Sequence, residues 1–134
     1  MTIMSEDGKV FVDVGNIEYW NCFYSTIITN LKNYINDNSL VMSFIKNGSC
    51  EHSDCLSIAR ELNLIKDKLS MLPPDQIVYD YNDLSKEPPW GSSISSIVTS
   101  CGNFFTTSDG RDLISEINIV LCYSSVKKVR VIMQ

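Results

Sequence analysis

Alternation of apolar and other residues indicates three short β-strands. In residues 9–14, valines recur at every second position, which is the period of a sheet with one buried face. In residues 126–133, the same alternation is formed by Val129, Val131 and Met133. Residues 76–81 contain a third strand pattern, in which Ile, Val and Tyr follow one another. The two valine-rich strands could pair with each other, although the pattern alone does not identify neighbouring strands.

A helical period of apolar residues marks five further segments. The clearest stripe repeats at i, i+3, i+4 and i+7 from Trp20 onward. Ser39 and Ser53 are expected to cap the second and third helices, because a serine side chain can accept a hydrogen bond from the first helical turn. The first four predicted helices cover residues 18–35, 39–46, 53–69 and 94–105. The fifth includes residues 113–121, and Ser108 or Asp109 is expected to cap it.

These elements predict an α+β fold. The expected order is strand, three helices, strand, two helices, strand, without repeats or linkers. We therefore expect a small sheet of about three or more strands with several amphipathic helices packed against it. With 134 residues, the chain is predicted to form a single compact domain over residues 1–134.

Composition favours a cytoplasmic protein with reduced thiols. No apolar window approaches the length that spans a bilayer, and the first residues lack the layout of a signal peptide. We therefore expect no membrane association. An odd number of scattered cysteines argues against a disulfide framework. The five cysteines are Cys22, Cys50, Cys55, Cys101 and Cys122.

The net charge of −5 is confined to one half of the chain. Residues 71–126 contain seven acidic and two basic residues, whereas the remaining acidic and basic residues cancel. Such a field repels nucleic acid and favours a basic partner. The alternative is a solvated face that serves solubility alone.

Catalytic and metal-binding patterns are weak. Cys50, His52 and Cys55 resemble part of a zinc site, but no fourth ligand is near in sequence. Cys55 could act as a nucleophile only with His52, the single histidine, and nothing marks an oxyanion hole. Phosphate-binding glycine loops are absent. We therefore expect no enzyme activity, no catalytic residues, no metal and no cofactor, and keep a cysteine-dependent enzyme using Cys55 and His52 as the alternative.

One loop combines aromatic side chains, carboxylates and prolines, as protein-binding surfaces do. Its candidate interface residues all lie in residues 79–87, called the 79–87 segment below. They are Tyr79, Asp80, Tyr81, Asp83 and Glu87. A structural motif of Pro88, Pro89, Trp90 and Gly91 follows, in which we expect Trp90 to fill part of the core.

A second acidic patch is predicted at Asp109, Asp112 and Glu116. The first two carboxylates could instead stabilise the N-terminus of the last helix, where the macrodipole favours negative charge. For Asp109 and Asp112 this structural role is the preferred interpretation.

Several ordered motifs resemble the immunity protein 70 family of bacterial polymorphic-toxin systems. The motifs are the helix from Trp20 to Leu31, residues 61–65, Leu72-Pro73-Pro74, residues 83–85, Pro88-Pro89-Trp90-Gly91 and residues 105–113. The resemblance implies a cytosolic antitoxin that binds one cognate toxin domain, without catalysis or cofactor. The toxin could belong to a contact-dependent growth inhibition system. Many such toxins are nucleases, whose basic groove an acidic partner could occlude. A regulatory protein-binding adaptor is the other alternative, and the oligomeric state stays open.

Overall fold

The sheet consists of three antiparallel strands in the order β2-β1-β3. The computed structural model describes residues 1–88 and 94–134, and all three strands lie within these ranges. They are β1 (Thr2–Ser5), β2 (Phe11–Asp13) and β3 (Val131–Met133). Ile3 of β1 lies opposite Val12 of β2 on one side and Met133 of β3 on the other.

The central strand, β1, is the one that the sequence pattern missed. Its four residues contain only two apolar side chains, too few to show an alternating period. Ile3 and Ser5 are nonetheless fully buried. Because β1 lies between them, the two valine-rich strands do not pair with each other, contrary to one of our expectations.

Four α-helices lie within the described residues, and their caps explain most boundaries. The helices are α1 (Ile17–Asn30), α2 (Leu40–Asn47), α3 (Cys55–Leu69) and α4 (Leu113–Lys127). Single 3-10 turns are formed by η1 (His52–Asp54), η2 (Pro74–Gln76) and η3 (Cys101–Asn103). Ser39 caps α2 as predicted, and Gly48 ends it with a positive φ of 68°.

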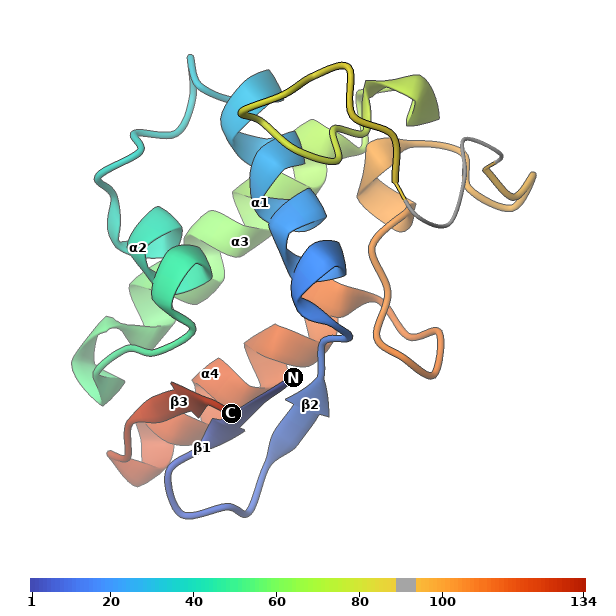
Figure 1. Cartoon of the computed structure of the whole chain (residues 1–134). Coiled ribbons are helices and arrows are strands. Elements are labelled where there is room, and N and C mark those ends of the chain that lie inside the picture. Colours follow the sequence, from blue (N-terminus) through green and yellow to red (C-terminus); the bar gives the residue numbers. More distant parts are fainter. Residues whose placement is uncertain (89–93) are drawn as a thin grey trace.

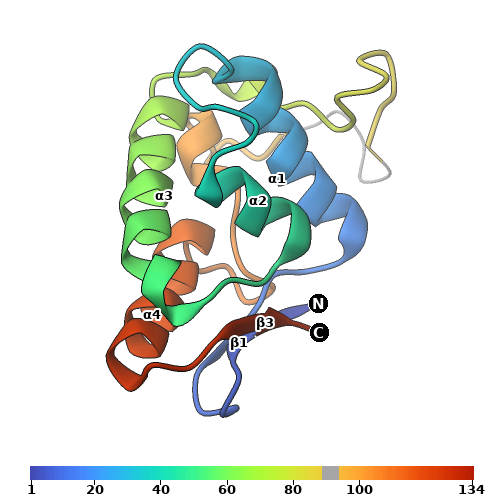
Figure 2. The ribbon, with the colours of Figure 1, turned by 90° about the vertical axis from the view of Figure 1, so that its left-hand side faces the viewer.

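The helices pack into one hydrophobic core with the sheet at one end of the molecule. Figure 1 and Figure 2 show α1, α2 and α3 on one side of the sheet and α4 beside it. α4 contacts both α3 and β1. Phe23 of α1, Phe44 of α2 and Leu62 of α3 are among the fully buried residues. The predicted α+β class is confirmed.

Two predicted elements are wrong. Residues 76–81 form no strand, because Val78 bonds to the side chain of Thr26 instead of to a neighbouring strand. The predicted helix over 94–105 is reduced to turns and η3, with Ile97 exposed to solvent.

Several boundaries also differ from the predictions. α4 continues to Lys127, so β3 begins at Val131, five residues after the start of the predicted strand. α1 ends at Asn30, although the following turns keep Leu31 and Ile35 in the core. α4 is capped by Asp112, whose carboxylate accepts a hydrogen bond from the Ser115 amide, and not by Ser108 or Asp109. η1 precedes α3, which therefore lacks the predicted Ser53 cap.

None of the helices in residues 1–88 and 94–134 is long and apolar enough to cross a membrane.

Candidate functional site

The chain between residues 76 and 82 is held on α1 by hydrogen bonds to helix side chains. The Thr26 hydroxyl accepts from the Val78 amide at 3.0 Å and donates to the Val78 carbonyl at 3.3 Å. The Tyr81 amide donates to Ser25 Oγ at 3.1 Å. Asn30 Nδ2 donates to the Gln76 carbonyl at 2.9 Å. Since Ser25 and Thr26 are buried, these contacts fix the start of the 79–87 segment firmly.

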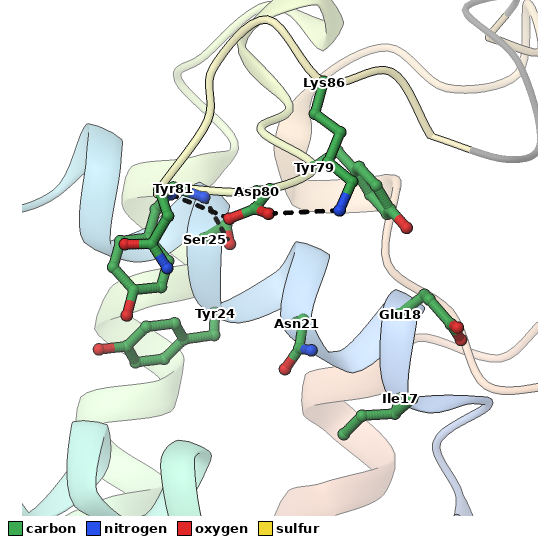
Figure 3. Close-up of a pocket in the computed structure, with 10 residues that line it drawn as sticks. Ile17, Glu18, Asn21, Tyr24, Ser25, Tyr79, Asp80, Tyr81 and Lys86 are labelled. Atoms are coloured by element: carbon green, nitrogen blue, oxygen red, sulfur yellow. Dashed lines mark hydrogen bonds and ion pairs between the residues drawn. The ribbon is translucent and has the colours of Figure 1, made fainter.

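A pocket of about 440 Å³ lies between α1 and this anchored segment. Figure 3 shows Glu18, Asn21 and Tyr24 of α1 on one side and Tyr79 and Tyr81 on the other. Ser25, Asp80, Asn82, Lys86 and Ile17 complete its lining. Tyrosine rings and carboxylates together suit a basic side chain of a partner protein, because they offer both cation–π and ion-pair contacts.

Asp80 and the tyrosines of the pocket are ordered by contacts within the chain. Asp80 accepts a hydrogen bond from the Asn82 amide at 2.9 Å and pairs with Lys86 at 3.7 Å. The Lys86 ammonium also lies 5.6 Å from the centre of the Tyr79 ring. The Tyr81 ring meets the Tyr24 ring edge-on, with 5.4 Å between their centres. The pocket is therefore largely preformed.

Asp83 and Glu87 are the freest acidic groups of the 79–87 segment. Both are exposed, and neither belongs to an ion pair among the described residues. Hydrogen bonds from the Ser85 hydroxyl and amide hold the pKa of Asp83 below its usual value. Asp83 therefore carries its negative charge at neutral pH, ready to attract a cation.

Replacing Thr26 by valine is expected to loosen the 79–87 segment while α1 stays folded. Valine keeps the shape of threonine, but the Val78 amide and carbonyl lose their partner. We expect a loss of about 1–3 kcal/mol in the free energy of unfolding, and faster hydrogen exchange at residues 78–82. Thr29→Val, at a half-buried position of the same helix, is the control. Unchanged exchange at Val78 would contradict the anchoring role of Thr26.

The second predicted patch lies away from this pocket, and its carboxylates are already paired. Asp112 caps α4 and forms an ion pair with Lys66 at 2.7 Å. Burial opposes its ionisation, but the bonds from Lys66 and Ser115 outweigh burial and lower the pKa of Asp112. Arg111 lies 3.0 Å from Asp109 and 3.1 Å from Glu116.

The arrangement of these carboxylates gives the second patch a structural explanation. Asp112 stabilises the N-terminus of α4, as we expected for both Asp109 and Asp112. Asp109 instead accepts a hydrogen bond from Thr107 in the preceding turn. Figure 1 places this turn and the 79–87 segment at different parts of the surface. The structure therefore does not bring the two acidic patches together, and a toxin-binding role of either stays a prediction.

The geometry around Cys55 does not resemble a nucleophilic pair. Cys55 is fully buried; its sulfur donates to the Glu51 carbonyl and lies 3.7 Å from the Cys50 sulfur. The hydrogen bond between the two sulfurs lowers the pKa of Cys55, because it stabilises one thiolate of the pair. The same hydrogen bond raises the pKa of Cys50, because loss of the second proton would place two negative charges together. The Cys55 amide donates to the His52 carbonyl, but no side-chain hydrogen bond joins the two residues in the described part of the chain.

Sequence reasoning missed the contribution of α1 to the pocket. Glu18, Asn21 and Tyr24 were assigned to a helix and nothing more. The signal that could have revealed the docking is the pair Ser25-Thr26, two small polar residues next to the apolar stripe. Pro88 is described and half-buried, but Pro89, Trp90 and Gly91 lie outside the described residues, so the expected packing of Trp90 is not addressed.

Comparison with known families gives one finding. A family model described as Immunity protein 70 matches residues 6–133, which is nearly the whole chain. No curated protein matches, and no solved structure does.

Proposed function

Because the chain belongs to the immunity protein 70 family and is therefore an immunity protein, we propose that it neutralises one cognate toxin domain by direct binding. The toxin would belong to a polymorphic or contact-dependent growth inhibition system and meet this protein in the cytoplasm. In this proposal the chain needs no cofactor and performs no catalysis.

The observation that carries the proposed surface is the anchoring of the 79–87 segment on α1. Buried hydroxyls of Ser25 and Thr26 fix the backbone at Val78 and Tyr81, so the part of the segment that contains Tyr79, Asp80 and Tyr81 loses little backbone entropy on binding. The pocket then receives a basic side chain of the toxin between Glu18 and Tyr79, while Asp83 and Glu87 contact the surrounding basic surface.

We propose that the toxin is a nuclease and that binding covers its active site. A nuclease groove is basic because it holds phosphates. The net charge of −5, concentrated in residues 71–126, is complementary to such a groove. The same charge would speed the encounter by long-range attraction.

The direct test uses the toxin domain encoded by the reading frame adjacent to this gene. We expect a tight complex, loss of toxin activity on binding, and an association rate that falls about tenfold or more between about 20 mM and about 500 mM salt. Tight binding with full toxin activity would contradict active-site occlusion. An association rate independent of salt would contradict the role of charge.

A further inference from the structure

The outer face of α4 is apolar although it faces solvent. One side of the helix is fully buried, with Leu113, Ile117 and Leu121 in the core. On the other side, the side chains of Ile119 and Val126 are 54% and 77% exposed. α4 therefore has apolar side chains facing solvent as well as the core, and an apolar stripe on a helix is normally covered. Within the described single chain, this outer face has no cover.

The exposed residues of this face follow the spacing of a coiled-coil seam. Ser115, Ile119, Cys122 and Val126 are all exposed and follow one another at intervals of four, three and four residues. Alternating intervals of three and four align side chains in one narrow stripe, which packs best against another helix. Exposed apolar residues elsewhere, such as Phe11 and Met71, do not form such a series.

The charges of α4 are complementary to those of a second, antiparallel copy of α4. Glu116 lies in the first turn, whereas Lys127 and Lys128 lie at the other end. Glu116 and Lys127 share one flank, because the residues between them span about three turns. In an antiparallel pair, the acidic end of each helix lies beside the basic end of the other, and the helix dipoles are opposed.

We propose that two copies of this chain associate through α4 about a two-fold axis near Cys122. Pairing Ile119 with Val126 of the second copy, and Glu116 with Lys127 of the second copy, places the axis there. Both lysines are free of ion pairs in the described part of the chain, while Glu116 already accepts from Arg111. In the dimer, Lys127 would contact Glu116 of the second copy, which keeps its ion pair with Arg111. Arg111 itself remains exposed to solvent.

This interface leaves the toxin-binding surface accessible. In Figure 1 and Figure 2, α4 lies at the sheet end of the molecule, whereas residues 79–87 lie at the opposite end. A dimer would therefore present two toxin sites facing away from its axis. The inference depends on α4 alone and stands or falls separately from the proposed function.

The first test measures mass in solution as a function of concentration. We expect the full chain to reach twice its monomer mass in sedimentation equilibrium, and Val126→Glu to remain monomeric. The matched control is Ile97→Glu, which alters an equally exposed residue outside α4. A monomer at all concentrations, or a dimer that Val126→Glu leaves intact, would overturn the proposal.

Charge exchange tests the antiparallel orientation. Glu116→Lys and Lys127→Glu each place like charges together and are expected to raise the dimer dissociation constant about tenfold. The double variant with both substitutions restores opposite charges and should recover most of the affinity. Circular dichroism identifies any loss of fold in Glu116→Lys, which also loses its bond to Arg111. Failure of the double variant to recover, with the fold intact, would contradict the antiparallel register.

Cys122 reports the position of the axis. All five cysteines are described, and Cys122 alone is exposed. On a two-fold axis it meets its own copy, so oxidation by diamide, which accepts the two electrons and two protons, should form a disulfide-linked dimer rapidly. Cys122→Ser should abolish this product, and Cys50→Ser should not. Protection of Cys122 by the toxin, without dimerisation of the free chain, would assign this face to the toxin and overturn the proposal.

Discussion

Replacing Asp80, Asp83 and Glu87 together with lysine is expected to raise the dissociation constant for the toxin on the order of a hundredfold. The substitutions put positive charges at the rim of the pocket and change the net charge from −5 to +1, because each one replaces a negative charge with a positive one. Most of the effect should be a slower association rate, measured by surface plasmon resonance. The fold should persist, since all three side chains lie outside the core.

A charge-matched control separates local contact from the overall field. Glu6, Glu51 and Asp67 are exposed and lie outside residues 71–126. Replacing these three with lysine changes the net charge equally. If both triple variants bind the toxin equally weakly, the field of the whole protein accounts for the effect and the 79–87 segment is not the interface. If neither binds more weakly than the native chain, electrostatic recognition is wrong.

Removing residues 1–5 is expected to unfold the protein. β1 provides hydrogen bonds to both β2 and β3, and no other strand in the described residues can take its place. Domains of this size are stable by about 5–15 kcal/mol, and the loss of a central strand exceeds that reserve. The family match begins at residue 6, so a protein trimmed to the matched residues would lose this strand.

Circular dichroism and thermal unfolding would measure the loss. A graded variant, Ile3→Ala, should cost about 2–5 kcal/mol, because it leaves a cavity at a fully buried position. Phe11→Ala on the neighbouring strand is the control, as its side chain is exposed and surface changes usually lie within about 0.5 kcal/mol. A truncated protein with native thermal stability would show that β1 is dispensable.

Elements with a strong internal period could be predicted from the sequence. The stripe from Trp20 onward predicts α1, and Ser39 predicts the start of α2. Elements determined by distant partners could not be predicted. β1 has only four residues, and its burial depends on β2 and β3. Val78 lies in a segment with the sequence pattern of a strand, but its amide donates to Thr26 on α1. Local propensity is weak where tertiary contacts satisfy the backbone.

The candidate site could be predicted only in part. Aromatic residues mixed with carboxylates identify the 79–87 segment as a surface from sequence alone. The distances that create the pocket, such as that between Tyr81 and Tyr24, join residues far apart in the chain. The ion pairs of Asp112 and Glu116 likewise depend on Lys66 and Arg111, so the sequence could not distinguish paired from free carboxylates.

The strand order has a consequence for protein synthesis. Thr2 and Gln134 exchange two backbone hydrogen bonds of 2.8 Å each, so β1 pairs with a segment of this domain that is synthesised much later. β1 can form a hairpin with β2 early, but its other edge stays open until residues 131–133 emerge. Contacts this distant in sequence form slowly. The sheet is therefore complete only after residues 131–133 have been translated, and a ribosome stalled within α4 would leave β1 with one unpaired edge.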